Sequence, residues 1–298
     1  MEILFSSGVL VILANSKFEG DIAGVNPKFA HMVAVSRNAV KERNLRWANG
    51  IVPYVIDHSY TADERNTIMK AFNTYHMKTC LRFVERKTEA DYLYIYKDSG
   101  CYSMVGRAGG KQDLSLGSGC LYHEIIVHEL MHALGFWHEH SRADRDNFIR
   151  VRWENVAQGM ESQFSTVGQA FADFLGETYD YYSVLHYDRK AFTKNGENTI
   201  EALRSNMTDL LGLGLDLSDG DLRKINRLYE CHDGISSGVP TPHIPPQPTT
   251  GRPAKPDCID KFADCHMFKR YCFQENFNYV MKLYCSDTCG HCVVIRGK

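Results

Sequence analysis

The stretch HELMHALGFWHE, residues 128–139, decides the fold of this chain. On an α-helix with 3.6 residues per turn, His128 and His132 lie one above the other on one face. Gly135 can end this helix in a left-handed conformation, and the chain can then turn back to bring His138 to the same point. Three neutral imidazoles leave a fourth position open for water, which is typical of catalytic rather than structural zinc. The stretch therefore predicts a site for one catalytic Zn²⁺ per chain.

Glu129 directly follows the first of these histidines, so its carboxylate points toward the metal-bound water without ligating the metal. Zinc lowers the pKa of bound water, and Glu129 can take the proton and pass it to a leaving amine. For any single histidine, the alternative is a surface or core imidazole with no metal. The third histidine and the glycine in register favour the zinc site and peptide hydrolysis.

The rest of the large domain predicts a mixture of strands and helices. Ile51 to Ile56 and Asp91 to Lys97 have the alternation of strands. Thr61 and Glu64 form a capping box before one helix, and another helix is expected to begin at Ser218. The apolar faces of these helices hold Ile68, Met69, Phe72 and Tyr75 in the first, and Leu222, Ile225 and Tyr229 in the second.

The composition is that of an ordinary globular protein. The chain has 298 residues, 44% of them hydrophobic, and a formal net charge of -2, so it can bury at least one full core. It contains no long Lys/Arg run, which argues against nucleic-acid binding and against a polybasic membrane contact.

The first sixteen residues are predicted to be a signal peptide. They are apolar from Ile3 to Ala14, too short to span a bilayer but suited to a secretory leader. Because Glu2 stands where such leaders carry Lys or Arg, an ordinary buried strand or helix is the alternative. No second apolar stretch approaches ~20 residues, so no membrane anchor is expected.

The ten cysteines, an even number, indicate an oxidising and therefore extracellular compartment. Four are spread over the long middle of the chain, and six lie between 258 and 292. Zinc binding by the terminal six is an alternative, but Cys289 and Cys292 form a single C-x-x-C without a second pair, so disulfides are favoured. Asn206 opens the sequon Asn-Met-Thr and is a candidate glycosylation site.

Residues 234–257 hold seven of the nine prolines and have no periodic apolar pattern, which predicts a linker. It separates a large domain, ending near Cys231, from a small module at residues 258–292. That module is too short to fold on an apolar core alone, so it would need its disulfides.

The zinc stretch and its neighbours resemble the astacin family of metzincin zinc metalloendopeptidases, from about Phe18 to Cys231. The resemblance implies a two-lobed α+β domain with a twisted sheet above the cleft and the zinc helix on its floor. It also implies protein or peptide substrates and disulfides Cys80–Cys231 and Cys101–Cys120. The neighbouring motifs that carry it are TCLRFV at 79–84, GCYSMVGR at 100–107, GCLYH at 119–123 and HEHSRADRDNFI at 138–149.

Residues 183–187 match the family's methionine turn, with one departure. Leu185 stands where the family has Met, and because that side chain packs beneath the ligands, the change should cost less than ~1.5 kcal/mol. Tyr187 is retained. The resemblance implies that its phenol is a fifth zinc ligand at rest and stabilises the oxyanion during attack.

Phe18-Glu19-Gly20-Asp21 resembles the propeptide motif of astacin zymogens, which implies that the Asp21 carboxylate occupies the place of the catalytic water. The propeptide would span 17–37 and the catalytic domain 38–233, with cleavage between Arg37 and Asn38. The new amino terminus would then fold inward toward Glu139.

The terminal module has six cysteines between Cys258 and Cys292, Asp260 after the first of them, and the ending CSDTCGHC at 285–292. In these features it resembles a ShK-type domain. This implies disulfides Cys258–Cys292, Cys265–Cys285 and Cys272–Cys289. Because the interval 272–285 lacks the adjacent Lys-Tyr pair of the channel-blocking toxins, targeting of the enzyme to a substrate, extracellular matrix or cuticle is expected instead of channel block.

The expected function is that of a secreted zinc endopeptidase made as a zymogen. The alternative is a catalytically silent protein whose protease domain is a scaffold, against which the retained zinc motif argues. Many relatives prefer an acidic residue after the scissile bond through a basic side chain shortly before the last helix. Residues 211–218, LGLGLDLS, offer none, so that preference does not transfer.

Overall fold

The structure is a computed structural model, and the chain divides into two compact units, Met1–Ile235 and Ser236–Lys298. In the second unit, Cys272 and Cys289 form a disulfide, one of the pairs that the resemblance implies. The linker and the remaining module cysteines, Cys258, Cys265, Cys285 and Cys292, lie outside the described residues. The described residues are 3–6, 9–12, 17–24, 43–166, 174–231, 272 and 287–290.

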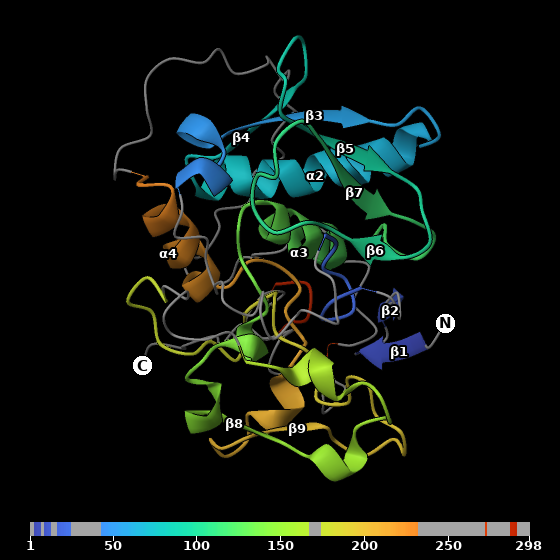
Figure 1. The fold of residues 1–298 in the computed structure, drawn as a ribbon, viewed down its shortest axis with the longest axis vertical. Coiled ribbons are helices and arrows are strands. Elements are labelled where there is room, and N and C mark those ends of the chain that lie inside the picture. Colours follow the sequence, from blue (N-terminus) through green and yellow to red (C-terminus); the bar gives the residue numbers. More distant parts are fainter. Residues whose placement is uncertain are drawn as a thin grey trace, which may run out of the picture. The chain divides into compact units, whose positions relative to one another are not determined.

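The first unit is built on a five-stranded sheet with the order β4-β3-β5-β7-β6 (Figure 1). Four strands run parallel, and the short edge strand β6 pairs antiparallel with β7. β3 has the predicted bounds, and β5 is one residue shorter at each end than predicted. The strands are β3 (Ile51–Ile56), β4 (Arg82–Glu85), β5 (Tyr92–Tyr96), β6 (Cys101–Tyr102) and β7 (Lys111–Leu116).

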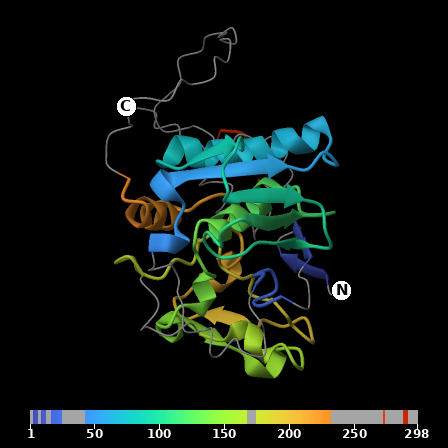
Figure 2. The ribbon, with the colours of Figure 1, turned by 45° about the horizontal axis from the view of Figure 1, so that its top comes forward.

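Two helices pack with this sheet, α2 (Ala62–Lys78) and α3 (His123–Ala133). α2 begins at the predicted capping box, in which Thr61 and Glu64 exchange hydrogen bonds. The hydroxyl of Tyr75, fully buried on α2, donates to the carbonyl of Val127 at 2.7 Å and ties the two helices together. α3 lies between the sheet and the second lobe of the unit, the lower lobe in Figure 1 (Figures 1 and 2).

The lower lobe has little regular structure and its own apolar core, which includes Phe164, Tyr187 and Phe192. β8 (Ile149–Val151) and β9 (Ile200–Ala202) form an antiparallel pair there. Near the amino terminus, β1 (Ile3–Ser6) and β2 (Val9–Ile12) form another pair. Short 3₁₀ helices span Arg43–Leu45, Ala48–Gly50, Glu139–Ser141, Arg145–Asn147, Trp153–Asn155, Glu161–Phe164 and Thr208–Leu210.

The last helix, α4 (Asp219–Leu228), begins after the predicted N-cap Ser218. Ile225 is fully buried, whereas Leu222 and Tyr229 lie at the edge of the core. The buried face of α4 is centred instead on Asp221, Lys224, Ile225 and Leu228. Its apolar stripe therefore carries two charged side chains that the sequence pattern did not predict.

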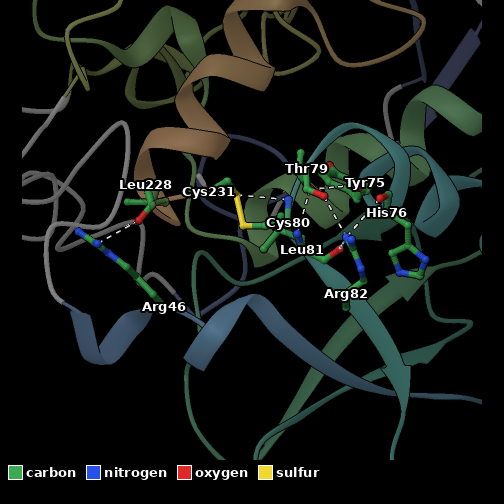
Figure 3. Close-up of a disulfide and its surroundings, with 9 residues drawn as sticks. All are labelled: Arg46, Tyr75, His76, Thr79, Cys80, Leu81, Arg82, Leu228 and Cys231. Carbon is green, nitrogen blue, oxygen red and sulfur yellow. Dashed lines mark hydrogen bonds between the residues drawn. A yellow bond between two sulfur atoms is a disulfide. The ribbon is translucent and has the colours of Figure 1, made fainter. Parts of the chain in front are cut away.

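A disulfide joins α4 to the end of α2 (Figure 3). Cys231 bonds to Cys80 across 151 residues of chain, and the Arg46 guanidinium donates to the carbonyl of Leu228 at 3.0 Å. A second disulfide, Cys101–Cys120, fastens β6 to the loop before α3. Both are pairs that the resemblance implies. No helix among the described residues is long and apolar enough to cross a membrane.

Candidate metal centre and active site

The three histidines of the zinc stretch converge on one point. His128 and His132 lie one turn apart on α3, which ends at Ala133. Gly135 has a φ of 110°, in the left-handed region that favours glycine, and the chain changes direction there. The Nε2 atom of His128 is 3.0 Å from that of His132 and 3.3 Å from that of His138.

In two of the rings, a backbone carbonyl holds the opposite nitrogen. Nδ1 of His128 lies 2.8 Å from the Val184 carbonyl, and Nδ1 of His132 lies 2.7 Å from the Phe136 carbonyl. Because these carbonyls can only accept, each Nδ1 carries the proton and each Nε2 presents its lone pair. Lone pairs facing one another at about 3 Å need a cation between them, so the donor set fits zinc.

Asp21 reaches the same point from the amino-terminal segment. Its Oδ2 atom lies 3.1 Å from Nε2 of His128 and 3.3 Å from Nε2 of His138, and its Oδ1 atom lies 3.8 Å from Nε2 of His132. The four ligand atoms all lie within 4.8 Å of one another. One carboxylate oxygen with three imidazole nitrogens is a suitable four-donor set for zinc.

Asp21 and His138 stabilise each other's charged form. Burial alone would raise the pKa of Asp21, but the surrounding imidazoles outweigh it and hold that pKa well below its usual range. For His138, burial alone would lower the pKa, but the carboxylates of Asp21 and Glu19 outweigh burial and raise the pKa to about 9. Without metal, the carboxylates therefore favour a proton on His138, whose place a bound cation takes.

Residues 17–24 are fixed in the site by their backbone. Ser103 donates its N–H to the Asp21 carbonyl at 3.1 Å, and the Ala23 N–H donates to the Ser103 carbonyl at 2.8 Å, in a parallel bridge. Phe18 is buried edge-on against Trp137 at a ring distance of 5.9 Å. The Asp21 carboxylate is thus aimed at the histidines by contacts on both sides of it.

Glu129 lies beside the ligands and is 1% exposed. Within the described part of the chain, its Oε2 atom has no hydrogen-bond partner. Burial raises the pKa of Glu129 well above its ordinary value, and the nearby Asp21 carboxylate raises it further. The structure therefore holds a carboxyl group with proton affinity beside the metal donors, where a water molecule or an amine would meet it.

Comparison with known proteins decides the family. Residues 39–230 match the family model described as Astacin, a peptidase family. The chain belongs to the astacin family. It is a zinc metalloendopeptidase, as the motif predicted, and His128, His132 and His138 are its zinc-binding group.

Similar astacins cover most of the chain. Zinc metalloproteinase nas-6 of Caenorhabditis elegans is 46% identical over 289 residues, which cover 93% of this chain and 84% of that protein. Zinc metalloproteinase nas-8 of the same organism is 41% identical, with 92% and 70% covered. The solved structure of high choriolytic enzyme 1, a hatching enzyme zinc-protease from Oryzias latipes, is 39% identical, with a TM-score of 0.61. That match covers 65% of this chain and 100% of the other. The predicted fold class is confirmed.

Tyr187 stands beside the zinc ligands in this astacin. Its ring stacks on His140 at 3.6 Å and packs against His138 at 4.7 Å. Its hydroxyl donates to the backbone carbonyl of Glu19 at 2.5 Å. Burial raises the pKa of this phenol well above its ordinary value, and the carboxylates of Asp21 and Glu19 raise it further, so it remains a donor.

Glu19 is a site residue that the sequence reasoning missed. Its carboxylate, fully buried, lies 2.7 Å from Nδ1 of His138, and its carbonyl binds Tyr187. Its φ of 47° places it in the left-handed turn that precedes Asp21. Glu19 is part of the motif that resembles the astacin propeptide. A single Glu between Phe18 and Gly20 does not, however, predict contacts with His138 and Tyr187.

The turn beneath the ligands carries Leu185, which is 1% exposed within the main core. Its carbonyl accepts the N–H of Glu139 at 2.9 Å, so the turn is bonded directly to the segment of the third ligand. The Asp221 carboxylate accepts from the Ser183 hydroxyl at 2.7 Å and from the Val184 N–H at 2.9 Å. α4 thereby braces the turn whose carbonyl orients His128.

Glu139, predicted to meet the new amino terminus, is fully buried in a charged network. It accepts from the Lys224 ammonium at 2.9 Å, from the Arg142 guanidinium at 3.1 Å and from the Asp180 N–H at 2.9 Å. Burial would raise the pKa of Glu139, but these cations outweigh it and lower the pKa. Lys224, 2% exposed, also reaches Asp221 at 3.2 Å.

Lys224 and Asp221 are further residues that the sequence reasoning missed. Helical spacing could have predicted that both are buried, because Lys224 lies one turn from Asp221 and one turn from Leu228 on the apolar stripe of α4. Arg37 and Asn38, the predicted cleavage site, lie outside the described residues. Asn206, in the predicted sequon, is exposed with a φ of 65°.

Proposed function

We propose that this chain is the precursor of a secreted astacin endopeptidase that hydrolyses peptide bonds of extracellular proteins. Residues 1–16 are the signal peptide, and residues 17–37 keep the enzyme inactive until cleavage after Arg37. The observation that carries the proposal is the position of the Asp21 carboxylate against the three ligand nitrogens. A peptide carbonyl and a water molecule would need the same place.

Removal of residues 17–37 would free three groups at once. Asp21 leaves the histidines, Glu19 leaves Nδ1 of His138, and the Tyr187 hydroxyl loses its acceptor carbonyl. The phenol, protonated and freed, would then donate to the oxyanion that forms during attack. The precursor contacts therefore block the substrate and also engage the donor that catalysis would use.

Glu129 would act as the general base and then as the general acid. Zinc, when bound, supplies a Lewis acid that polarises the scissile carbonyl and acidifies water. Glu129 takes a proton from the attacking water and delivers it to the leaving amine, for which a raised carboxyl pKa is suited. His128, held by the Val184 carbonyl, keeps its ring orientation throughout.

The cofactor would be one Zn²⁺, and the partners would be protein substrates. The ShK-type module at 258–292 would bring the enzyme to extracellular matrix or cuticle. The new amino terminus at Asn38 would join Lys224 and Arg142 at Glu139.

The test of latency uses a precursor that cannot be processed, made with Arg37→Gln. Adding Asp21→Ala should give an uncleaved chain that hydrolyses casein, because the carboxylate no longer competes for the site. The matched control is Asp63→Ala, an exposed acid on α2 far along the chain from the metal centre. If the Asp21→Ala precursor stays as inert as its parent while retaining zinc, the proposed latch is wrong.

A further inference from the structure

Glu124 is a buried acid that the mechanism above does not use. It is 7% exposed, and its Oε1 atom has no hydrogen-bond partner among the described residues. Burial raises its pKa, and only its own backbone N–H and the imidazole of His123 act in the opposite direction. A buried carboxylate oxygen without a partner is unfavourable, so Oε1 of Glu124 is open to a donor that arrives from outside the fold.

The helix places Glu124 on the face that carries the zinc ligands. It precedes His128 by four residues and His132 by eight, so the three side chains follow one stripe of α3. Four residues correspond to a rotation of about 40° from His128 and a rise of about 6 Å along the axis. An extended peptide advances about 3.3 Å per residue, so a substrate lying along α3 would bring a residue one or two positions from the scissile bond opposite Glu124.

The loop at 211–217 runs beside this end of α3. A Cβ atom added to Gly214 would lie 3.1 Å from Cα of Val184, whose carbonyl holds His128. Two residues further on, Asp216 lies 3.5 Å from Nε2 of His123, the first residue of α3. Residues 214–216 therefore run from Val184, the residue whose carbonyl holds His128, to the first residue of α3, which precedes Glu124.

This loop supplies no positive charge to Glu124. Its sequence, LGLGLDL, contains neither Lys nor Arg. Lys78, which binds to the loop from α2, is engaged by Asp216 at 2.6 Å. Leu213 and Leu215, on either side of Gly214, are half-buried, so each leaves some apolar surface uncovered.

We infer that Glu124 is a specificity residue for a cationic substrate side chain, Lys or Arg, within two positions of the scissile bond. The aliphatic stem of that side chain would lie along Leu213 and Leu215, and its charged head would pair with the Glu124 carboxylate. An acidic side chain at the same position would be repelled. The inference rests on the proposed peptidase function and adds a substrate class to it.

The experiment measures the cleavage preference of the chain processed after Arg37. A peptide library is cleaved first, to find which position within two residues of the cut is enriched in Lys or Arg. Two quenched peptides that differ only by Lys or Met at that position then give kcat and KM. The variants are Glu124→Gln, which keeps the shape and removes the charge, and Glu161→Gln, an exposed acid, as the matched control.

The wild type and the Glu161→Gln control should cleave the Lys peptide at least about tenfold better than the Met peptide in kcat/KM, mainly through KM. In Glu124→Gln the ratio should fall below about threefold, with cleavage of the Met peptide unchanged. A wild-type library profile without Lys or Arg enrichment overturns the inference, even if the variant fails to fold. So does a preference that persists in Glu124→Gln. A wild type that cleaves no peptide at all would instead overturn the proposed function.

Discussion

Replacing Lys224 by Met removes the central cation of the buried network on α4. The ammonium lies 2.9 Å from Glu139 and 3.2 Å from Asp221, and both carboxylates are fully buried. Met has a similar length and is apolar, so the change removes charge with little loss of volume. It leaves two buried carboxylates with Arg142 as the remaining cation on Glu139.

Breaking a buried ion pair by removing one partner typically costs about 3–5 kcal/mol, so Lys224→Met should lower the free energy of unfolding by that amount at pH 7. Urea unfolding followed by tryptophan fluorescence measures it, with Lys194→Met, an exposed lysine, as the control. The control should stay within about 0.5 kcal/mol of wild type. A loss of less than about 1 kcal/mol in Lys224→Met, the scale of a surface pair, would refute the reasoning.

The same variant has a defined dependence on pH. The pKa of Glu139 is lowered from its ordinary value of 4.5 by Lys224 and Arg142, despite burial. A lowered carboxyl pKa contributes stability above the unfolded value and loses it as the pH falls through the folded value. Without Lys224, burial raises the pKa of Glu139 in the variant, so the difference between wild type and variant should be largest at neutral pH and shrink as the pH falls and Glu139 becomes protonated. A difference that stays constant over this range would contradict the assignment.

Two further predictions concern the supports of the site. Replacing both Cys80 and Cys231 by Ala opens a loop of 151 residues, for which the chain-entropy model gives about 5 kcal/mol. Urea unfolding should show a loss of about 2–5 kcal/mol, and a loss below about 1 kcal/mol would show that α4 is held by other contacts. Leu185→Met should change stability by less than about 1.5 kcal/mol and leave zinc content unchanged, because the two side chains are nearly equal in volume. A change of about tenfold in kcat/KM would instead assign the turn a more direct part in catalysis.

Local geometry made part of this site predictable from sequence. The spacing of His128 and His132 and the glycine at 135 determine where the imidazoles point, because helical periodicity and left-handed φ are short-range properties. The capping residues Thr61 and Ser218 were predictable for the same reason, since each acts on the three residues that follow it.

Contacts between distant segments were not predictable in this way. The carbonyls of Val184 and Phe136 orient two ligands, but a backbone oxygen has no sequence signature. Lys224 meets Glu139 from 85 residues away, and Glu19 meets His138 from 119 residues away. These pairs depend on how α4 and the amino-terminal segment pack in three dimensions, which hydrophobic periodicity does not specify.

The most direct test of the central claim compares zinc content and hydrolysis in the processed wild type and in Glu129→Gln. Both proteins should bind one zinc ion per chain, because Glu129 is not among the metal donors and the three histidines remain after processing. Only the wild type should cleave a quenched peptide, with kcat in the variant lower by at least about 10² and chelation abolishing cleavage by the wild type. Hydrolysis by zinc-loaded Glu129→Gln within about tenfold of wild type, or a zinc-loaded wild type that cleaves nothing, would contradict the account.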